Sequence, residues 1–258
     1  MTAYQMPLEI FYEREARHPN KRFMIQPQGD GQLEELSWSE VGEQARRAAN
    51  WLRGQDIEQG SRIAIISKNC AHWIIADLAI WMAGMVSVPL YPNLTAESVR
   101  QVLEHSESKV AFIGKLDDWA AMAPGIPEGV HCVGLPLRPE GRFDLLWSDL
   151  QACTPIRDNP LPPADQLATI IYTSGTTGMP KGVMHNFNNF AFSATRGREL
   201  FAVSENDRVL SYLPLCHVAE RSFVEMSSLY GGVEIYFAQS LDTFVEDIRR
   251  AFQKHRVI

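Results

Sequence analysis

Hydrophobic positions along this chain follow two periodicities that alternate from one end to the other. Short apolar or β-branched runs predict strands at 22–26, 34–38, 62–67, 85–88, 109–113, 130–135, 168–172, 182–185, 208–213 and 233–237. Longer stretches with an apolar face predict helices at 8–17, 37–53, 71–83, 96–105, 145–152, 187–200, 218–229 and 243–255. Strands that alternate with helices of this length form parallel sheets covered by helices, so the pattern predicts an α/β fold.

Polar residues indicate where several of these elements begin. Ser37 with Glu40 forms a capping-box pattern at the start of the helix that runs to about residue 53. Asn69 is placed to cap the helix that begins at residue 71. The segment 154–163 holds four prolines and little that packs. We therefore predict that it is a linker that carries the chain to the strand 168–172.

The stretch 73–91 is apolar enough to be compared with a membrane span. About 20 apolar residues can cross a bilayer, but Asp77 would place a charge in lipid at a considerable cost. Gly84 and Pro89 also interrupt the run. A buried helix that turns at Gly84 into a strand is the better interpretation, and it predicts a soluble protein.

Composition limits the function classes further. With 258 residues, 45% of them hydrophobic, the chain can bury a substantial core as one large domain or two small ones. Its net charge of −7, without a basic run, argues against nucleic acid as a partner. The four cysteines lie far apart and lack metal-site spacing, which indicates free thiols in a reducing compartment. The N-terminus lacks the features of a secretory signal, so we expect a cytoplasmic protein.

Residues 170–185, IIYTSGTTGMPKGVMH, carry most of the chemical information in the chain. Glycines allow backbone N–H groups to face a ligand, hydroxyls can bind phosphate or magnesium, and Lys181 adds a positive charge. The P-loop of kinase-type NTPases does not fit, because its second glycine would fall on Pro180 and Gly182 follows the lysine. A polyphosphate-binding loop is therefore predicted, and a plain flexible loop between a strand and a hairpin is the less specific alternative.

This segment resembles, nearly residue for residue, the phosphate loop of the AMP-forming adenylate synthetases, which include acyl-CoA synthetases, luciferases and nonribosomal adenylation domains. Residues 81–92, WMAGMVSVPLYP, look like the family's early helix-to-strand motif. Residues 211–221, SYLPLCHVAER, resemble a later motif in the form seen in long-chain and related fatty acyl-CoA synthetases. The resemblance implies an incomplete N-terminal adenylation domain of the acyl-CoA synthetase type.

The resemblance also implies a reaction. In such enzymes a carboxylate attacks the α-phosphate of ATP to give an acyl-adenylate and pyrophosphate, and CoA then displaces AMP, so the implied partners are fatty acid, ATP, CoA and Mg²⁺. His217 would lie beside the acyl carboxylate and the α-phosphate, and Thr177 is the favoured hydroxyl for Mg²⁺. The residues implied to hold the β- and γ-phosphates are Thr173, Ser174, Gly175, Thr176, Thr177, Gly178 and Lys181.

Two further features of the later motif bear on the site. Glu220 and Arg221 form either a structural ion pair or part of the site, and the sequence leaves both readings open. Amino-acid-activating members place an aspartate where this chain has 214–217, PLCH, so an amino-acid substrate is disfavoured. Aromatic residues nearby are candidates for an acyl tunnel, although core positions are the better interpretation: Phe187, Phe190, Phe192, Phe201, Phe223 and Tyr230.

Family members carry further parts after the region that corresponds to Ile258, including a Tyr-Gly-x-Thr-Glu segment and a small domain with a catalytic lysine. Neither is found after Lys181 here. The resemblance therefore implies that 1–258 is the N-terminal part of an AMP-binding domain, without the C-terminal half of the large domain and the lid domain. Alone it should have little or no ligase activity.

The leading hypothesis is thus the N-terminal portion of an ATP-dependent fatty acid–CoA ligase. One alternative is the same family acting on another carboxylic acid, for instance an aryl or medium-chain acid. Another is a non-catalytic nucleotide- or acyl-binding protein. Apolar surface where the absent half would dock allows self-association as a homodimer, and peripheral contact with a membrane also stays open.

Overall fold

The computed structural model describes residues 4–29, 31–173, 180–240 and 243–252. Within them, the larger sheet has the strand order β7–β6–β5–β3–β4–β8–β9. All neighbours in this sheet are parallel except β8 and β9, which form an antiparallel hairpin. In chain order the strands are β3 (Arg62–Ile66), β4 (Val86–Leu90), β5 (Val110–Ile113), β6 (His131–Gly134), β7 (Leu145–Leu146), β8 (Leu167–Thr173) and β9 (Lys181–Asn186).

The smaller sheet has the order β10–β11–β1–β2. Its β1 and β2 are antiparallel neighbours, whereas β1 pairs with β11, and β11 with β10, in parallel. The sheet therefore pairs early strands with late ones. Its strands are β1 (Arg22–Pro27), β2 (Leu33–Ser37), β10 (Arg208–Ser211) and β11 (Glu234–Phe237).

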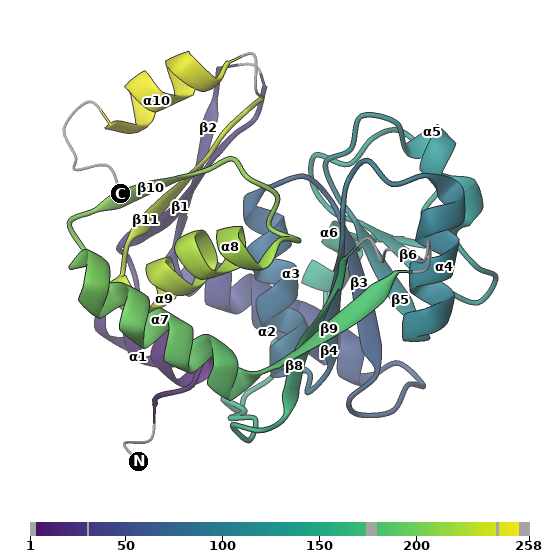
Figure 1. The fold of residues 1–258 in the computed structure, drawn as a ribbon, viewed down its shortest axis with the longest axis horizontal. Helices are drawn as coiled ribbons and strands as arrows, with labels where there is room; N and C mark the ends of the chain where they lie inside the picture. The colour runs from purple at the N-terminus through teal and green to yellow at the C-terminus, as the bar shows by residue number, and fades with distance from the viewer. Residues whose placement is uncertain (1–3, 30, 174–179, 241–242, 253–258) are drawn as a thin grey trace.

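Helices cover the sheets, as Figure 1 shows, and α3 (Ala71–Met82) lies between them. Every residue of α3 is buried, because the helix contacts β3 and β4 on one side and β1 on the other. This double packing explains why its sequence is apolar on all sides apart from His72 and Asp77. Among the described residues, no helix combines the length and the apolar character needed to span a bilayer.

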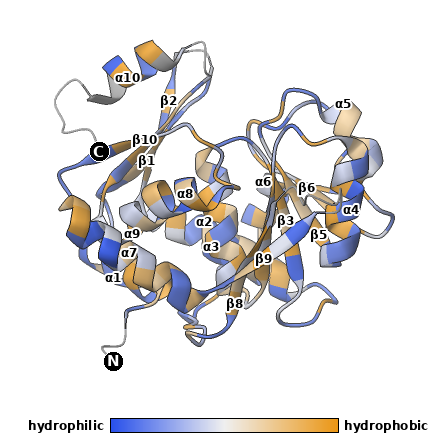
Figure 2. Cartoon of the chain, in the orientation of Figure 1, coloured by the Kyte–Doolittle hydropathy of each residue, from blue (hydrophilic) through white to orange (hydrophobic). Residues whose placement is uncertain are grey.

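The other helices lie around this centre. On the outer side of the larger sheet, α4 (Ala96–Ser106) and α5 (Trp119–Met122) are followed by a 3₁₀ turn at Ala123–Gly125. Hydrophobic residues dominate strands such as β3 and β8, whereas helices such as α4 and α7 mix both kinds (Figure 2). The remaining helices are α1 (Pro7–Arg17), α2 (Trp38–Arg53), α6 (Trp147–Gln151), α7 (Phe187–Phe201), α8 (Val218–Glu220), the π-helix η2 (Arg221–Met226), α9 (Ser227–Gly231) and α10 (Phe244–Phe252).

The predicted α/β class is confirmed, and several local predictions need correction. The capping box of Ser37 and Glu40 is present, but Asn69 does not cap α3. Its N-cap is Cys70, and the first N–H, that of Ala71, donates to the buried Gln26 side chain on β1 at 2.9 Å. The single helix expected at 218–229 is divided into α8, η2 and α9, and 145–152 begins with a short strand.

The proline-rich segment 154–163 is irregular, as a linker would be, yet it packs along α2. Ile156 is buried, and its N–H donates to the Arg46 carbonyl. Asn50 donates to the Thr154 carbonyl at 2.8 Å. Ile156 is thus the buried residue in a segment that is otherwise exposed or half-buried, and the further contacts from α2 reach side chains, from Arg46 to Asn159 and from Arg53 to Asp158.

Candidate functional site

A cavity of about 590 Å³ lies where β4 and β8 end, beneath one face of α4. In α/β sheets, ligands bind at the carboxyl ends of parallel strands, which is the position of this cavity. None of its described lining residues is an aspartate or glutamate, so the cavity can accept an anion. It is lined by Pro89, Leu90, Tyr91, Leu94, Ser98, Gln101, Val102, Tyr172, Thr173, Pro180 and His217.

The mouth of the β8–β9 hairpin forms one wall of this cavity. Thr173 and Lys181 are register partners across the hairpin, and both side chains are exposed. The predicted phosphate-binding residues Ser174, Gly175, Thr176, Thr177 and Gly178 lie outside the described residues. The segment that follows Lys181 is a strand and not a helix, which separates this loop from a kinase-type P-loop in structure as well as in spacing.

Tyr172, which the sequence analysis did not single out, anchors this wall. Its hydroxyl lies 2.7 Å from Nδ1 of His105, in the last turn of α4. The tyrosine precedes Thr173 directly, so it fixes the strand end from which the Gly/Thr segment begins. Its position inside the 170–185 motif was the only available signal, because the partner is far away in sequence.

His217 forms the opposite wall of the cavity. It is the N-cap of α8, and its Nδ1 accepts a hydrogen bond from the Ala219 N–H at 3.2 Å. A neutral imidazole whose Nδ1 accepts carries its proton on Nε2. The exposed ring therefore presents an N–H donor, and the structure brings His217 and Thr173 to the same cavity.

Glu220, one residue before the π-helix, is buried and holds the end of β10. Its carboxyl accepts from the Ser211 hydroxyl at 3.1 Å and from the Tyr212 N–H at 3.0 Å. Burial raises its pKa to about 7, although these hydrogen bonds and one from Asn69 oppose the shift. None of these hydrogen-bond partners lines the cavity, so the contacts indicate a structural role.

Asn69 joins the same cluster from the end of β3. Its amide nitrogen donates to the Ser211 hydroxyl at 2.8 Å and to the Leu213 carbonyl at 2.5 Å. Its oxygen accepts from the Leu215 N–H at 2.9 Å. The carboxyl ends of the two sheets therefore meet at Asn69, and this contact sets the turn that leads to His217.

Arg221 is completely buried, and its ion pairs are with Asp77 and Glu225 instead of Glu220. The Glu225 oxygen lies 3.1 Å from its Nε. Glu225 was not singled out from the sequence, although its spacing of four residues from Arg221 was a usable signal. Three aromatic rings surround the guanidinium, with centroids 5.0–5.5 Å from its carbon: Trp73, Trp81 and Phe190.

A second cavity, of about 340 Å³, lies between α7 and η2. Val218, the neighbour of His217, lines it, so the first turn of α8 separates the two cavities. The aromatic residues of this region are divided, since Phe187, Phe190 and Tyr230 are buried whereas Phe192, Phe201 and Phe223 are exposed. The second cavity is lined by His185, Asn188, Asn189, Phe190, Phe192, Ser193, Val218 and Ser222.

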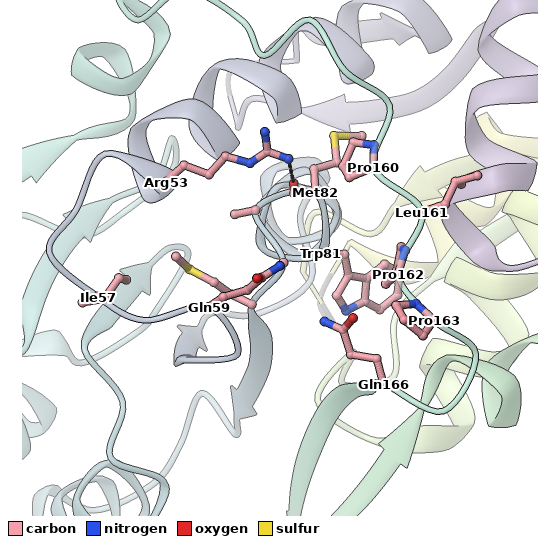
Figure 3. Close-up of a pocket in the computed structure, with 13 residues that line it drawn as sticks. Arg53, Ile57, Gln59, Trp81, Met82, Pro160, Leu161, Pro162, Pro163 and Gln166 are labelled. Atoms are coloured by element: carbon pink, nitrogen blue, oxygen red, sulfur yellow. Dashed lines mark hydrogen bonds between the residues drawn. The ribbon is translucent and has the colours of Figure 1, made fainter.

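A third cavity, of about 350 Å³, lies at the opposite end of β4 and is drawn in Figure 3. Trp81, Met82 and the prolines 160, 162 and 163 line it, and Arg53 at its edge donates to the Met82 carbonyl at 2.7 Å. It lies at the amino end of the strand and holds none of the predicted site residues. The first cavity is therefore the candidate site.

This arrangement defines a class. A parallel strand leads into a hairpin whose mouth faces a histidine donor across a cavity, at the carboxyl ends of the strands, where α/β proteins bind their ligands. The chain belongs to the AMP-binding enzyme family, whose model matches residues 11–257. Members of this family are adenylate-forming ligases, and the recognition made from the sequence motifs is confirmed.

Named relatives agree with this assignment. Long chain acyl-CoA synthetase 5 of Arabidopsis thaliana is 29% identical over 93% of this chain and 40% of its own length. The 2-succinylbenzoate–CoA ligase of Bacillus licheniformis is 31% identical over 93% of this chain and 46% of its own length. The chain thus spans less than half the length of these relatives.

Solved structures show the same fold. The O-succinylbenzoate coenzyme A synthetase of Bacillus subtilis, in complex with AMP, matches with a TM-score of 0.76 at 24% identity, over 96% of this chain and 60% of the other. The anthranilate CoA ligase AuaEII, in complex with anthranoyl-AMP, matches with a TM-score of 0.83 at 18% identity, over 97% of this chain and 49% of the other.

Proposed function

We propose that this chain supplies the phosphate-binding hairpin and the acid-activating wall of an ATP-dependent, AMP-forming carboxylate–CoA ligase. The observation that carries the proposal is the 590 Å³ cavity, which has Thr173 and Pro180 on one side and His217 on the other. Thr173 and Pro180, which flank the Gly/Thr segment, thus face the His217 donor across a cavity. The described lining of this cavity includes no carboxylate.

The residues have distinct proposed roles. The attack of a carboxylate on the α-phosphate brings two anions together, so catalysis depends on positioning and charge neutralisation. Lys181 and the hydroxyl of Thr173 hold the outer phosphates, together with the hairpin residues 174–178. His217 donates its Nε2 proton in a hydrogen bond to the negative charge that develops between the acid and the α-phosphate.

The described residues fit ATP better than they fit a metal ion alone. The exposed Lys181 ammonium and Thr173 hydroxyl suit phosphate oxygens. No group of three or more metal-binding side chains occurs within the described ranges. Bound Mg²⁺ would supply charge neutralisation at the phosphates, with Thr177 as its proposed protein hydroxyl and the phosphates as further ligands. CoA is the proposed second co-substrate.

A fatty acid is the first candidate for the acid, because several relatives are named long-chain acyl-CoA synthetases. The organic part of the acid is proposed to enter the second cavity, since His217 lines the first cavity and the next residue, Val218, lines the second. An aryl acid with polar substituents is the second candidate. Amide and hydroxyl groups of Asn188, Asn189, Ser193 and Ser222 line this cavity, and one relative is a 2-succinylbenzoate–CoA ligase.

The described residues are proposed to form the N-terminal part of an adenylation domain in a cytoplasmic enzyme. On this proposal, the exposed Phe192, Phe201 and Phe223 pack against further protein, either the rest of the domain or a second copy. A complete ligase activity is accordingly expected of the longer protein, and binding of nucleotide or pyrophosphate is expected of this chain.

Isothermal titration with pyrophosphate and with MgATP tests the proposal on this chain. We expect saturable binding that weakens with added salt, because the contacts are electrostatic. Acid-dependent release of pyrophosphate by the full-length protein, measured across a series of alkanoic acids and aryl acids, separates the two substrate candidates. Failure of this chain to bind either ligand would overturn the assignment of the hairpin.

A further inference from the structure

A single buried hydroxyl joins the π-helix η2 to two strands, β8 and β4, whose ends line the candidate site. Arg221 Nη1, on η2, donates to the Thr169 hydroxyl on β8 at 2.8 Å. That hydroxyl in turn donates to the Ser87 carbonyl on β4 at 2.9 Å. The ends of β4 and β8 line the cavity, and the turn before η2 carries His217. The Arg221–Thr169 contact therefore ties the two walls of the site together from behind.

Arg221 also connects directly to the turn that carries His217. Its backbone N–H donates to the His217 carbonyl at 3.2 Å, which closes the first turn of α8. Within this turn the Ala219 N–H donates to His217 Nδ1. A displacement of Arg221 would move the backbone that sets the orientation of the imidazole ring.

Each side-chain nitrogen of Arg221 has a specific hydrogen-bond partner. Burying an arginine is unfavourable unless its charge and hydrogen bonds are satisfied. Here its donors reach Asp77 on α3, Thr169 on β8 and Glu225 on its own helix. Burial and the nearby Asp77 carboxylate raise the pKa of Glu225, so the cluster need not hold two full negative charges.

We infer that Arg221 is a positioning residue, which holds His217 at a fixed position relative to β8, the strand that leads into the Gly/Thr segment. The inference rests on the proposed function, which makes the position of His217 relative to β8 important. The contacts of Arg221 explain how that position is maintained. An apolar side chain of similar volume would fill the space, but it could not link η2 to β8.

The substitution Thr169→Val tests the link, because it removes the hydroxyl and nearly preserves the side-chain volume. Thr169→Ser is the matched control, since it keeps the hydroxyl. The readout is the tautomer of His217 in protein labelled with ¹⁵N at histidine, with the His217 signals assigned by comparison with His217→Gln. His131, on the distant β6, serves as an internal reference.

In the parent chain and in Thr169→Ser, we expect separate Nδ1 and Nε2 signals for His217, with the proton on Nε2. In Thr169→Val we expect loss of that single tautomer, seen as averaged nitrogen signals, while His131 is unchanged. A lowered melting temperature without any change at His217 would mean that the link is only structural and would overturn the inference. An averaged His217 in the parent chain would overturn it as well.

Arg221→Lys provides a second variant if Thr169→Val does not fold. A lysine keeps the positive charge but cannot reach Thr169 and Asp77 together, so the same loss of the single tautomer is expected. Pyrophosphate titration of the same samples reports on the proposed function separately. If the parent chain binds no pyrophosphate, the proposed function fails, whereas the His217 signals still decide the role of Arg221.

Discussion

His105 Nδ1 and the Tyr172 hydroxyl lie 2.7 Å apart, and the two rings meet edge to face with centroids 5.7 Å apart. The contact joins the last turn of α4 to β8, one residue before Thr173. Burial raises the pKa of Tyr172, so the hydroxyl keeps its proton near neutral pH and can donate to His105. The pair therefore connects the wall of the cavity to the start of the hairpin loop.

Removing this hydroxyl should weaken both stability and anion binding. We expect Tyr172→Phe to lower the free energy of unfolding by ~1 kcal/mol, the usual net value of one hydrogen bond. Pyrophosphate affinity should fall with it, because the strand end is less well fixed. Tyr91→Phe is the control, since Tyr91 lines the same cavity and its hydroxyl makes no hydrogen bond to a described residue. Equal effects of the two substitutions in urea denaturation and calorimetry would contradict this role.

Lys181 should contribute to ligand binding and not to stability. Its side chain is exposed at the hairpin mouth, so Lys181→Met should change the free energy of unfolding by less than ~0.5 kcal/mol. Pyrophosphate affinity should fall by roughly tenfold, which corresponds to about 1.4 kcal/mol. Lys109→Met removes another exposed lysine, directly before β5, and should leave the affinity unchanged. An unchanged affinity in Lys181→Met would remove this lysine from the site.

Periodicity predicted most of the strands and helices, because burial on one face leaves a pattern in the sequence. The candidate site was predicted in part, since the residue types of 170–185 and His217 carry chemistry on their own. Asn69 shows why other features were missed. Its position before α3 suggested a helix cap, but its amide instead joins Ser211, Leu213 and Leu215 across the two sheets. Contacts between residues so far apart in sequence leave no local signal.

The same limit applies to the π-helical turn that begins at Arg221. The apolar spacing over 218–229 predicted one helix, whereas the structure has a π-helix at Arg221–Met226. Such π turns are rare, and this one begins at a buried guanidinium that contacts Asp77 and Thr169. The spacing of Arg221 and Glu225 was visible, but the carboxylate on α3 was not recognisable as a partner without the fold.

Glu220 should make stability depend on pH. Its pKa is raised from 4.5 to about 7 in the folded protein, so the folded state binds the proton more tightly than the unfolded state does. Stability from this group is therefore greatest at low pH and is lost as pH rises from about 4.5 to about 7. Glu220→Gln should remove this loss, which is at most about 3 kcal/mol.

Two other buried groups must be considered when this profile is measured. Burial lowers the pKa of His72 to about 4, which contributes stability that increases as pH rises through the same range. Glu225, whose pKa is also raised, acts in the same direction as Glu220. Urea denaturation from pH 4.5 to 8 should therefore be measured on both the parent chain and Glu220→Gln. The difference between the two stability profiles is the contribution of Glu220. Parallel profiles for the two proteins would show that Glu220 is ionised throughout.

Ile156 should behave as a core residue even though it lies in the proline-rich segment. It is 7% exposed, and its N–H donates to the Arg46 carbonyl of α2. We therefore expect Ile156→Ala to lower the free energy of unfolding by about 2–4 kcal/mol, as for other buried aliphatic side chains. Leu161→Ala is the matched control, because Leu161 is 59% exposed and its loss should cost less than ~0.5 kcal/mol. If both variants unfold at the same urea concentration as the parent chain, the segment is a free linker after all, and the hydrogen bonds that α2 donates to it do not hold it in solution.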